Sequence, residues 1–278
     1  MEQANAIELK NITKRFGEVV ANDSVDLSVK HGEILSVLGE NGSGKTTLMN
    51  MISGIYFPDE GQIFVDGEEV SICSPKDSFA LGIGMIHQHF KLVDVLTAAE
   101  NIILGLEGKS VLDMKKVVQD IQEVTERYGF ELDPNQKIYD MSVSQKQTVE
   151  IVKMLYRGAN ILILDEPTAV LTPQETEKLF TVLRNMRDQG KSIIIITHKL
   201  NEVLALSDRV SVLRKGKYIG TVETKNATAE SLTEMMVGEK IDLNIERPDP
   251  VNPVKRLVIE NLSCVNKEGV KTLKNASM

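Results

Sequence analysis

The 278-residue sequence predicts an α/β fold whose core is a mostly parallel β-sheet. One observation is a set of short apolar runs without polar alternation, at residues 34–38 (ILSVL), 161–164 (ILIL) and 193–196 (IIII). Such runs are typical of strands buried on both faces of a parallel sheet. A second observation is that glycines, acids or a histidine soon follow these runs, at the sheet edge where α/β proteins place their chemistry.

Residues 39–47 (GENGSGKTT) match the phosphate-loop pattern of Gly, four residues, Gly, Lys and Ser or Thr. A predicted strand precedes the loop, and residues 46–53 predict a helix that Gly54 would end. This order disfavours the alternative of a glycine-rich turn with a surface lysine. The glycines let backbone N–H groups turn towards phosphate oxygens, and the helix N-terminus adds partial positive charge. Lys45 would reach the β- and γ-phosphates, and the Thr46 hydroxyl would coordinate Mg²⁺.

We therefore expect a nucleoside triphosphate to bind at this loop. The predicted ligand-binding residues are Gly39, Asn41, Gly42, Ser43, Gly44, Lys45, Thr46 and Thr47.

Bulk properties exclude several classes of protein. The formal net charge of −8 argues against a nucleic-acid surface, which relies on Lys and Arg patches. No apolar run is long enough to span a bilayer, and the first residues lack the pattern of a signal peptide. Cys73 and Cys264 match no metal-binding spacing, so we expect buried or neutral thiols in a reducing cytosol, and a disulfide is the disfavoured alternative.

The chain before the phosphate loop predicts two half-buried strands, because residues 7–12 and 25–29 alternate in polarity. Phe16 lies between them. Its ring either packs in the core or stacks on an adenine face, and the pattern alone leaves both open.

Gln88 follows another short apolar run, residues 84–86. It is either an exposed polar residue or a group whose amide reaches Mg²⁺ or an attacking water. His87 and His89 are two residues apart on an extended segment and point to opposite faces, so we expect no shared metal.

Residues of about 94–157 predict a helical region. Val117, Ile121 and Val124 have helical spacing within residues 112–128, and Ser142 is the expected N-cap of a helix that runs to Gly158. After it, Asp165 and Glu166 end one buried run and His198 ends the next. The alternative for the acidic pair is a helix-capping role.

The last residues repeat the first. Residues 243–256 hold several prolines and predict a linker. Beyond it, residues 257–263 resemble residues 7–13, and residues 272–278 resemble residues 21–27. We expect the chain to be the front half of a tandem protein that stops inside its second copy.

Together these motifs resemble the ATP-binding subunit of ABC transporters. The matching motifs are residues 39–47, Gln88, residues 141–147, residues 161–166 and His198. Residues 86–90, 99–102 and 168–175 are similar to the tandem importers of nucleosides and simple sugars. The resemblance implies a P-loop NTPase fold with a RecA-like core sheet, an antiparallel β-subdomain and an inserted α-helical subdomain. It also implies a nucleotide-binding domain at residues 1–242, a linker at 243–256 and the start of a second domain at 257–278.

The resemblance assigns roles to the acidic pair and its neighbours. Asp165 would hold Mg²⁺ through water, and Glu166 would orient and deprotonate the attacking water. His198 would contact the γ-phosphate, and Gln88 would sense it and reach the metal. The family pattern also favours stacking of Phe16 on adenine.

The signature motif departs from the family pattern. Residues 141–145 read MSVSQ, with Ser144 in place of the second glycine, and Thr148 replaces the usual Arg. Ser142 and the helix N-terminus would still donate to a γ-phosphate. The signature acts in trans in this family, so Ser144 would impair the site around the second copy's loop. Thr172 replaces a frequent Asp, which weakens the expected communication between sites.

The implied function is ATP hydrolysis that energises an importer from the cytoplasmic side of the membrane, with ATP and Mg²⁺ as ligands. The implied partners are transmembrane permease subunits, a second nucleotide-binding domain and, indirectly, an extracytoplasmic substrate-binding protein. One alternative is a soluble ATPase of the same type that acts on ribosomes or DNA; the interval from Lys45 to Ser142 is too short for a repair-type coiled coil. The other is an ATP-binding module that is inactive without its second half.

Overall fold

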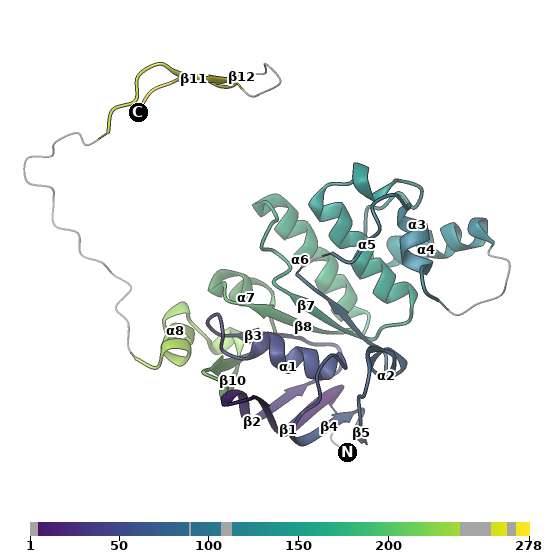
Figure 1. Cartoon of the computed structure of the whole chain (residues 1–278), viewed down its shortest axis with the longest axis vertical. Coiled ribbons are helices and arrows are strands. Elements are labelled where there is room, and N and C mark those ends of the chain that lie inside the picture. Colours follow the sequence, from purple (N-terminus) through teal and green to yellow (C-terminus); the bar gives the residue numbers. More distant parts are fainter. Residues whose placement is uncertain (1–4, 89, 107–112, 240–256, 266–270) are drawn as a thin grey trace, which may run out of the picture. The chain divides into compact units, whose positions relative to one another are not determined.

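The computed structural model describes residues 5–88, 90–106, 113–239, 257–265 and 271–278. The chain forms two units, Met1–Ile241 and Asp242–Met278, which are drawn in Figure 1. The predicted linker at 243–256 and the residue His89 lie outside the described residues.

A six-stranded sheet with the order β10-β9-β3-β8-β7-β6 is the framework of the first unit. All strands except β10 run parallel, which confirms the predicted parallel core. Every residue of β3 and β8 is buried, as their apolar runs require. The strands are β3 (Ile34–Leu38), β6 (Ile83–Ile86), β7 (Ile161–Asp165), β8 (Ser192–Thr197), β9 (Arg209–Arg214) and β10 (Lys217–Glu223).

The register of the strand pairs determines where the predicted nucleotide site lies on the sheet. Leu38 at the end of β3 is paired with Thr197 of β8, and Asp165 at the end of β7 is paired with Ile196. The carboxyl ends of these three strands therefore meet at one edge of the sheet.

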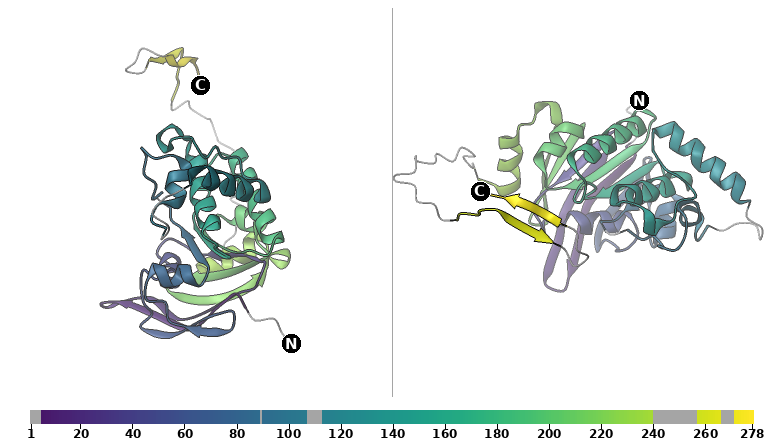
Figure 2. Two further views of the ribbon diagram at one scale, coloured as in Figure 1. Left: turned by 90° about the vertical axis from the view of Figure 1, so that its right-hand side faces the viewer. Right: turned by 90° about the horizontal axis from the view of Figure 1, so that it is seen from above.

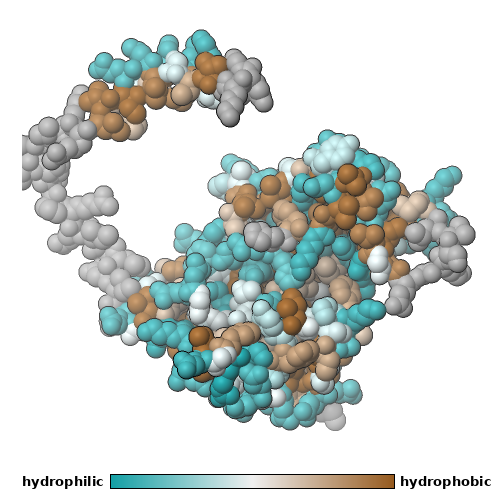
Figure 3. All heavy atoms as spheres, in the orientation of Figure 1, coloured by the Kyte–Doolittle hydropathy of each residue, from teal (hydrophilic) through white to brown (hydrophobic). Residues whose placement is uncertain are grey.

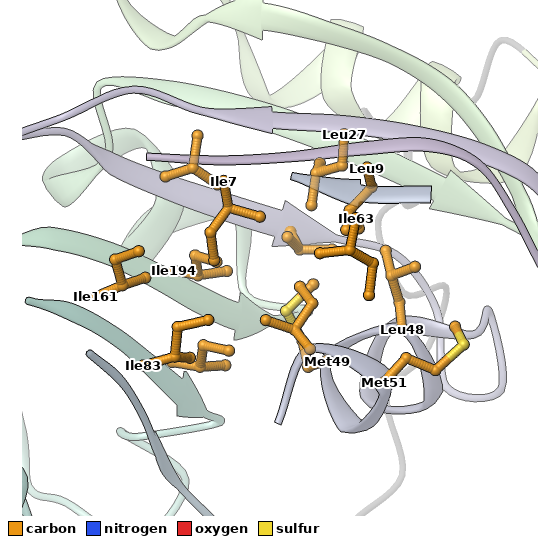
Figure 4. Packing of buried hydrophobic residues seen from close by; sticks show 14 of the residues in the cluster. Ile7, Leu9, Leu27, Leu48, Met49, Met51, Ile63, Ile83, Ile161 and Ile194 are labelled. Atoms are coloured by element: carbon orange, nitrogen blue, oxygen red, sulfur yellow. The ribbon is translucent and has the colours of Figure 1, made fainter. Parts of the chain in front are cut away.

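One face of this sheet is covered by α1 (Lys45–Ile52) and a second, antiparallel sheet with the order β2-β1-β4-β5. Leu48 and Met49 of α1 share a buried cluster with Ile63 of the small sheet and Ile194 of the large one, as Figure 4 shows. This arrangement confirms the expected β-subdomain. Its strands are β1 (Ile7–Phe16), β2 (Val19–Val29), β4 (Glu60–Val65) and β5 (Glu68–Val70).

Helices cover the other face and one end of the sheet (Figures 1 and 2). Apolar side chains of α6 pack on outward residues of β7 and β8, and three further helices form their own core at residues 98–156, as predicted. In the described ranges no helix has the length and apolarity to cross a bilayer. The helices are α2 (Pro75–Ala80), α3 (Ala98–Ile103), α4 (Met114–Tyr128), α5 (Val143–Tyr156), α6 (Pro173–Asp188), α7 (Leu200–Leu206) and α8 (Ala229–Val237).

The second unit contains a hairpin of β11 (Leu262–Val265) and β12 (Lys271–Ala276). Its described side chains are almost all exposed, including the free thiol of Cys264. Cys73 in the first unit is also a free, exposed thiol. The thiols are free, as expected, but the expectation that they would be buried was wrong, because the spacing of cysteines carries no information on burial.

Candidate nucleotide-binding site

The loop between β3 and α1 has the backbone shape that an anion site needs. Gly42 and Gly44 have left-handed φ angles of 81° and 96°. A Cβ on Gly44 would lie 2.7 Å from Nδ2 of Asn22 and would collide with the carbonyl oxygen of Ala21, so only glycine fits. No side chain of the described residues caps α1, whose first N–H groups are thus available to an anion.

Lys45 lies at the base of this loop. Its ammonium donates to the carbonyl oxygens of Gly39 at 2.7 Å and Glu40 at 2.8 Å. Burial lowers the pKa of Lys45, and the negative charges of Glu166 and Asp165 partly offset that effect. A desolvated cation of this kind gains stability from a bound polyanion, which fits the predicted contact with phosphates.

Asp165 and Thr46 form a pair of oxygen donors at the mouth of the loop. The Thr46 hydroxyl donates to Oδ2 of Asp165 at 3.3 Å. Burial raises the pKa of Asp165, and the charge of Glu166 raises it further. A half-buried carboxylate next to a hydroxyl suits Mg²⁺, which binds one or two protein oxygens and completes its shell with phosphates and water. The described residues contain no cluster of three or more His, Cys, Asp or Glu side chains that would hold a metal alone.

Glu166 and His198 are in direct contact. Oε1 of Glu166 lies 2.8 Å from Nδ1 of His198, which follows β8. Glu166 has a left-handed φ of 48°, and its N–H donates to the carbonyl of Ile196 at 2.9 Å. Non-glycine residues rarely adopt this conformation, and such strain is concentrated at functional sites.

A cleft of about 700 Å³ joins most of the predicted site. The loop backbone is held there from the other side, because the N–H of Gly216 donates to the carbonyl of Ser43 at 3.2 Å. The predicted residues that line the cleft are Asn41, Gly42, Gly44, Lys45, Thr46, Thr47, Gln88, Asp165 and Glu166.

Several other residues that line this cleft were not predicted from the sequence. Lys215 and Gly216, in the turn between β9 and β10, bring positive charge and a backbone anchor. The basic composition of that turn was the available signal, but nothing local placed it beside the loop. Val19, Val20, Ala21 and Ile196 complete the lining.

The other predicted site residues do not line the cleft: Gly39, Ser43, His198, Phe16, Ser142 and Ser144. Phe16 is 43% exposed at the end of β1, where it makes an edge contact with Tyr56 at 5.2 Å between ring centroids. It pairs across the hairpin with Val19, a residue of the cleft. Stacking of Phe16 on adenine therefore stays a prediction.

The two serines lie at the N-terminus of α5. Ser142 caps the helix: its Oγ accepts from the N–H of Gln145 at 3.3 Å. The Ser144 hydroxyl donates to Oε1 of Glu175 on α6 at 2.6 Å. Action of the signature in trans is consistent with this placement and stays a prediction.

Two curated relatives match nearly the whole chain. A nucleoside import ATP-binding protein, NupA of Lactococcus lactis subsp. cremoris, is 48% identical over all of this chain and 55% of its own length. A guanosine import ATP-binding protein, NupO of Bacillus subtilis, is 47% identical over 98% of this chain and 54% of its own length. The chain thus spans about half the length of these relatives.

Solved structures give the same fold. The ADP conformation of MJ1267, an ATP-binding cassette of an ABC transporter, superimposes with a TM-score of 0.75 at 26% identity, covering 84% of this chain and 99% of that one. The dimeric bacterial ABC transporter cassette MJ0796 gives 0.67 at 28% identity over 78% of this chain and 98% of that one. A family model described as ABC transporter matches residues 22–169, more than half of the sequence. The chain belongs to the ABC transporter family, whose ATP-binding cassette fold it adopts.

Proposed function

We propose that this chain binds ATP with Mg²⁺ and hydrolyses it within the energy-supplying subunit of an importer. The observation that carries the proposal is the convergence at one cleft of the phosphate loop, the Thr46–Asp165 pair and Glu166, whose carboxylate contacts His198. A glycine-rich turn or a capping pair would not require this convergence.

Each group has a defined task in this reaction. Lys45 and the N-terminus of α1 hold the phosphates, while Thr46, Asp165 and Gln88 are the oxygen donors available to Mg²⁺, which would neutralise phosphate charge. Glu166 is the base that takes a proton from the attacking water, and His198 holds the Glu166 carboxylate through its ring nitrogen.

The names of the relatives support a class of transported molecule and a set of partners. The names of NupA and NupO support import of nucleosides, and a ribose import ATP-binding protein at 44% identity keeps simple sugars open. Such a subunit works with transmembrane permeases on the cytoplasmic face of the membrane and, indirectly, with an extracytoplasmic binding protein. Exposed apolar residues on the helical region supply a surface for a permease: Val93, Val95, Leu104 and Leu106. Figure 3 shows hydrophobic surface over this end of the unit.

A second nucleotide-binding domain is part of the proposal, with the first at residues 1–242, a linker at 243–256 and the second beginning at 257. The β11–β12 hairpin supports this because it repeats the β1–β2 hairpin in detail. The pair Cys264–Leu273 has the register of Lys14–Asn22. The N–H of Asn275 donates to Oγ of Ser263 just as the N–H of Ser24 donates to Oγ1 of Thr13.

Left-handed residues also recur at matching positions of the two hairpins, Asn261 and Asn275 in the second and Asn11 and Ser24 in the first. The two domains would enclose ATP between the loop of one and the signature of the other, and the dimeric structure of the MJ0796 cassette supports such pairing.

Steady-state release of phosphate tests the proposal. We expect MgATP to bind to this chain, and we expect turnover from a longer protein that continues through a complete second domain. Turnover should fall by about 10²- to 10⁴-fold in Glu166→Gln. If the longer protein binds ATP without releasing phosphate, the chain is an ATP-binding module instead, and the hydrolytic function is wrong.

A further inference from the structure

Helix α5 carries a polar stripe on the side that packs against the core. Ser144, Gln147 and Glu150 are three residues apart, so they lie on one face of the helix. Each forms a hydrogen bond with a different segment of the chain, and Gln147 and Glu150 are both only 5% exposed. Polar groups this deeply buried are costly unless each finds a partner, so their contacts are structurally specific.

Gln147 holds the turn that carries Glu166. Its Nε2 donates to the carbonyl of Pro167 at 2.8 Å, one residue beyond Glu166. Gln147 also lines a small cavity of about 100 Å³ together with Gln88, Asp165 and Glu166. It therefore lies directly behind the acidic pair, on the side of the helical region.

Glu150 holds the segment that follows Gln88. Its Oε1 accepts the backbone N–H of Lys91 at 2.6 Å. Burial raises the pKa of Glu150, whereas the bond from Lys91 and the nearby charge of Lys153 oppose that rise. The donor is a backbone N–H group, so this contact constrains the backbone near Gln88 independently of the Lys91 side chain.

We propose that Gln147 and Glu150 are positioning residues for ATP hydrolysis. They attach the Glu166 turn and the Gln88 segment to α5, the helix that begins within the signature motif at residues 141–147, to which Gln147 itself belongs. A shift of that helix then moves the base and the γ-phosphate sensor together. This role rests on the proposed ATPase function, but it concerns two residues that do not line the nucleotide cleft.

Near-isosteric variants in the complete protein test the role. Gln147→Met and Glu150→Met keep side-chain size and lose the hydrogen bond, whereas Glu150→Gln keeps an acceptor oxygen for Lys91. We expect both methionine variants to lose about 10- to 100-fold in kcat, the cost of small misplacements of catalytic groups. The Kd for ATP should stay within about twofold, since contacts to the phosphates are unchanged. Glu150→Gln should have a kcat within about threefold of that of the unsubstituted protein. Glu126→Met, an exposed glutamate on α4, is the matched control.

Hydrogen exchange of the Lys91 amide gives a local readout that does not depend on turnover. Exchange should accelerate in Glu150→Met and remain slow in Glu150→Gln. Full kcat in the methionine variants, or equal losses in Glu150→Gln and Glu150→Met, would overturn the positioning role and leave the ATPase function intact. If one methionine variant fails to fold, two measurements still test the positioning role. These are the kcat of the other methionine variant and the exchange rate of the Lys91 amide in Glu150→Gln. An original protein that releases no phosphate would overturn both proposals.

Discussion

The N-termini of α1 and α5 are both expected to face phosphate, but they are built differently. Within the described part of the chain no side chain caps α1, and its preceding residue, Gly44, has a left-handed backbone. In contrast, α5 begins with a complete capping box, in which Ser142 accepts from the N–H of Gln145 and the side chain of Gln145 accepts from the N–H of Ser142. The donors of α1 are available to a ligand, whereas those of α5 are already partly satisfied.

This difference indicates that the two helix ends bind nucleotide under different conditions. The α1 end is preorganised, so it should bind nucleotide in the single chain. The α5 end must exchange internal hydrogen bonds for bonds to a ligand, and the Ser144 hydroxyl is further committed to Glu175 on α6. Binding at α5 should therefore be weaker and should depend on a partner domain.

The largest effect is expected for Glu166, the proposed catalytic base. Glu166→Gln should reduce turnover by about 10²- to 10⁴-fold because the amide cannot accept a proton, while ATP binding persists. Phosphate release and ATP titration of the longer protein measure the two quantities. Glu177→Gln, at an exposed position of α6, is the control. Unchanged turnover in Glu166→Gln would remove Glu166 from its role.

The next effect separates the two helix ends directly. Lys45→Ala should weaken ATP binding by about 2 kcal/mol, roughly 30-fold in Kd, because a charge-assisted contact to phosphate is lost. Ser142→Ala should leave the Kd of the single chain unchanged. Calorimetry with both variants and with Lys178→Ala, an exposed lysine on α6, provides the comparison. Equal losses of ATP affinity in Lys45→Ala and Ser142→Ala would contradict the proposed difference between the two helix ends.

A pH dependence is expected from Asp165. Its pKa is raised by burial, so the carboxyl takes up a proton at a higher pH than an ordinary aspartate does. The protonated form cannot hold Mg²⁺, and the Mg²⁺-dependent part of ATP affinity should decline as pH falls through that raised pKa. Asp165→Asn should show weak affinity with no such decline. An affinity that is flat with pH in the original chain would argue against Asp165 as a metal ligand.

The smallest effect on ATP binding is expected for Ser144, the residue at which the signature motif departs from the family pattern. Ser144→Gly removes the largest cause of the lowered pKa of Glu175, which should rise towards its usual value. ATP affinity of the single chain should change less than about twofold, because Ser144 does not line the nucleotide cleft. Titration by NMR and calorimetry check the two parts. An unchanged Glu175 pKa would show that the hydroxyl bond does not persist in solution.

Local patterns in the sequence were sufficient for much of the fold. The run before Gly39 and the helix after it were predicted because each depends on neighbouring residues, and the structure has β3 and α1 there. The capping role of Ser142 was predicted for the same reason. The positions of Asp165 and His198 beside the loop followed from the rule that parallel strands place their carboxyl ends together.

Contacts between distant residues were not predicted. The bond from Gly216 to Ser43 and the bond from Gln147 to Pro167 join segments whose separation leaves no periodic pattern. Burial was also unpredictable where it depends on other elements. Ile12 of the first hairpin is 1% exposed within the core, whereas Leu262 at the equivalent position of the second hairpin is 44% exposed. The same local sequence pattern therefore specifies strand register without specifying what covers it.

A crystal structure of the chain with Mg²⁺ and a non-hydrolysable ATP analogue tests the central claim most directly. We predict the triphosphate within residues 39–47, one Mg²⁺ beside Thr46 and Asp165, and Glu166 facing the γ-phosphate. A nucleotide bound elsewhere on the chain, or a metal without contact to either residue, would contradict it.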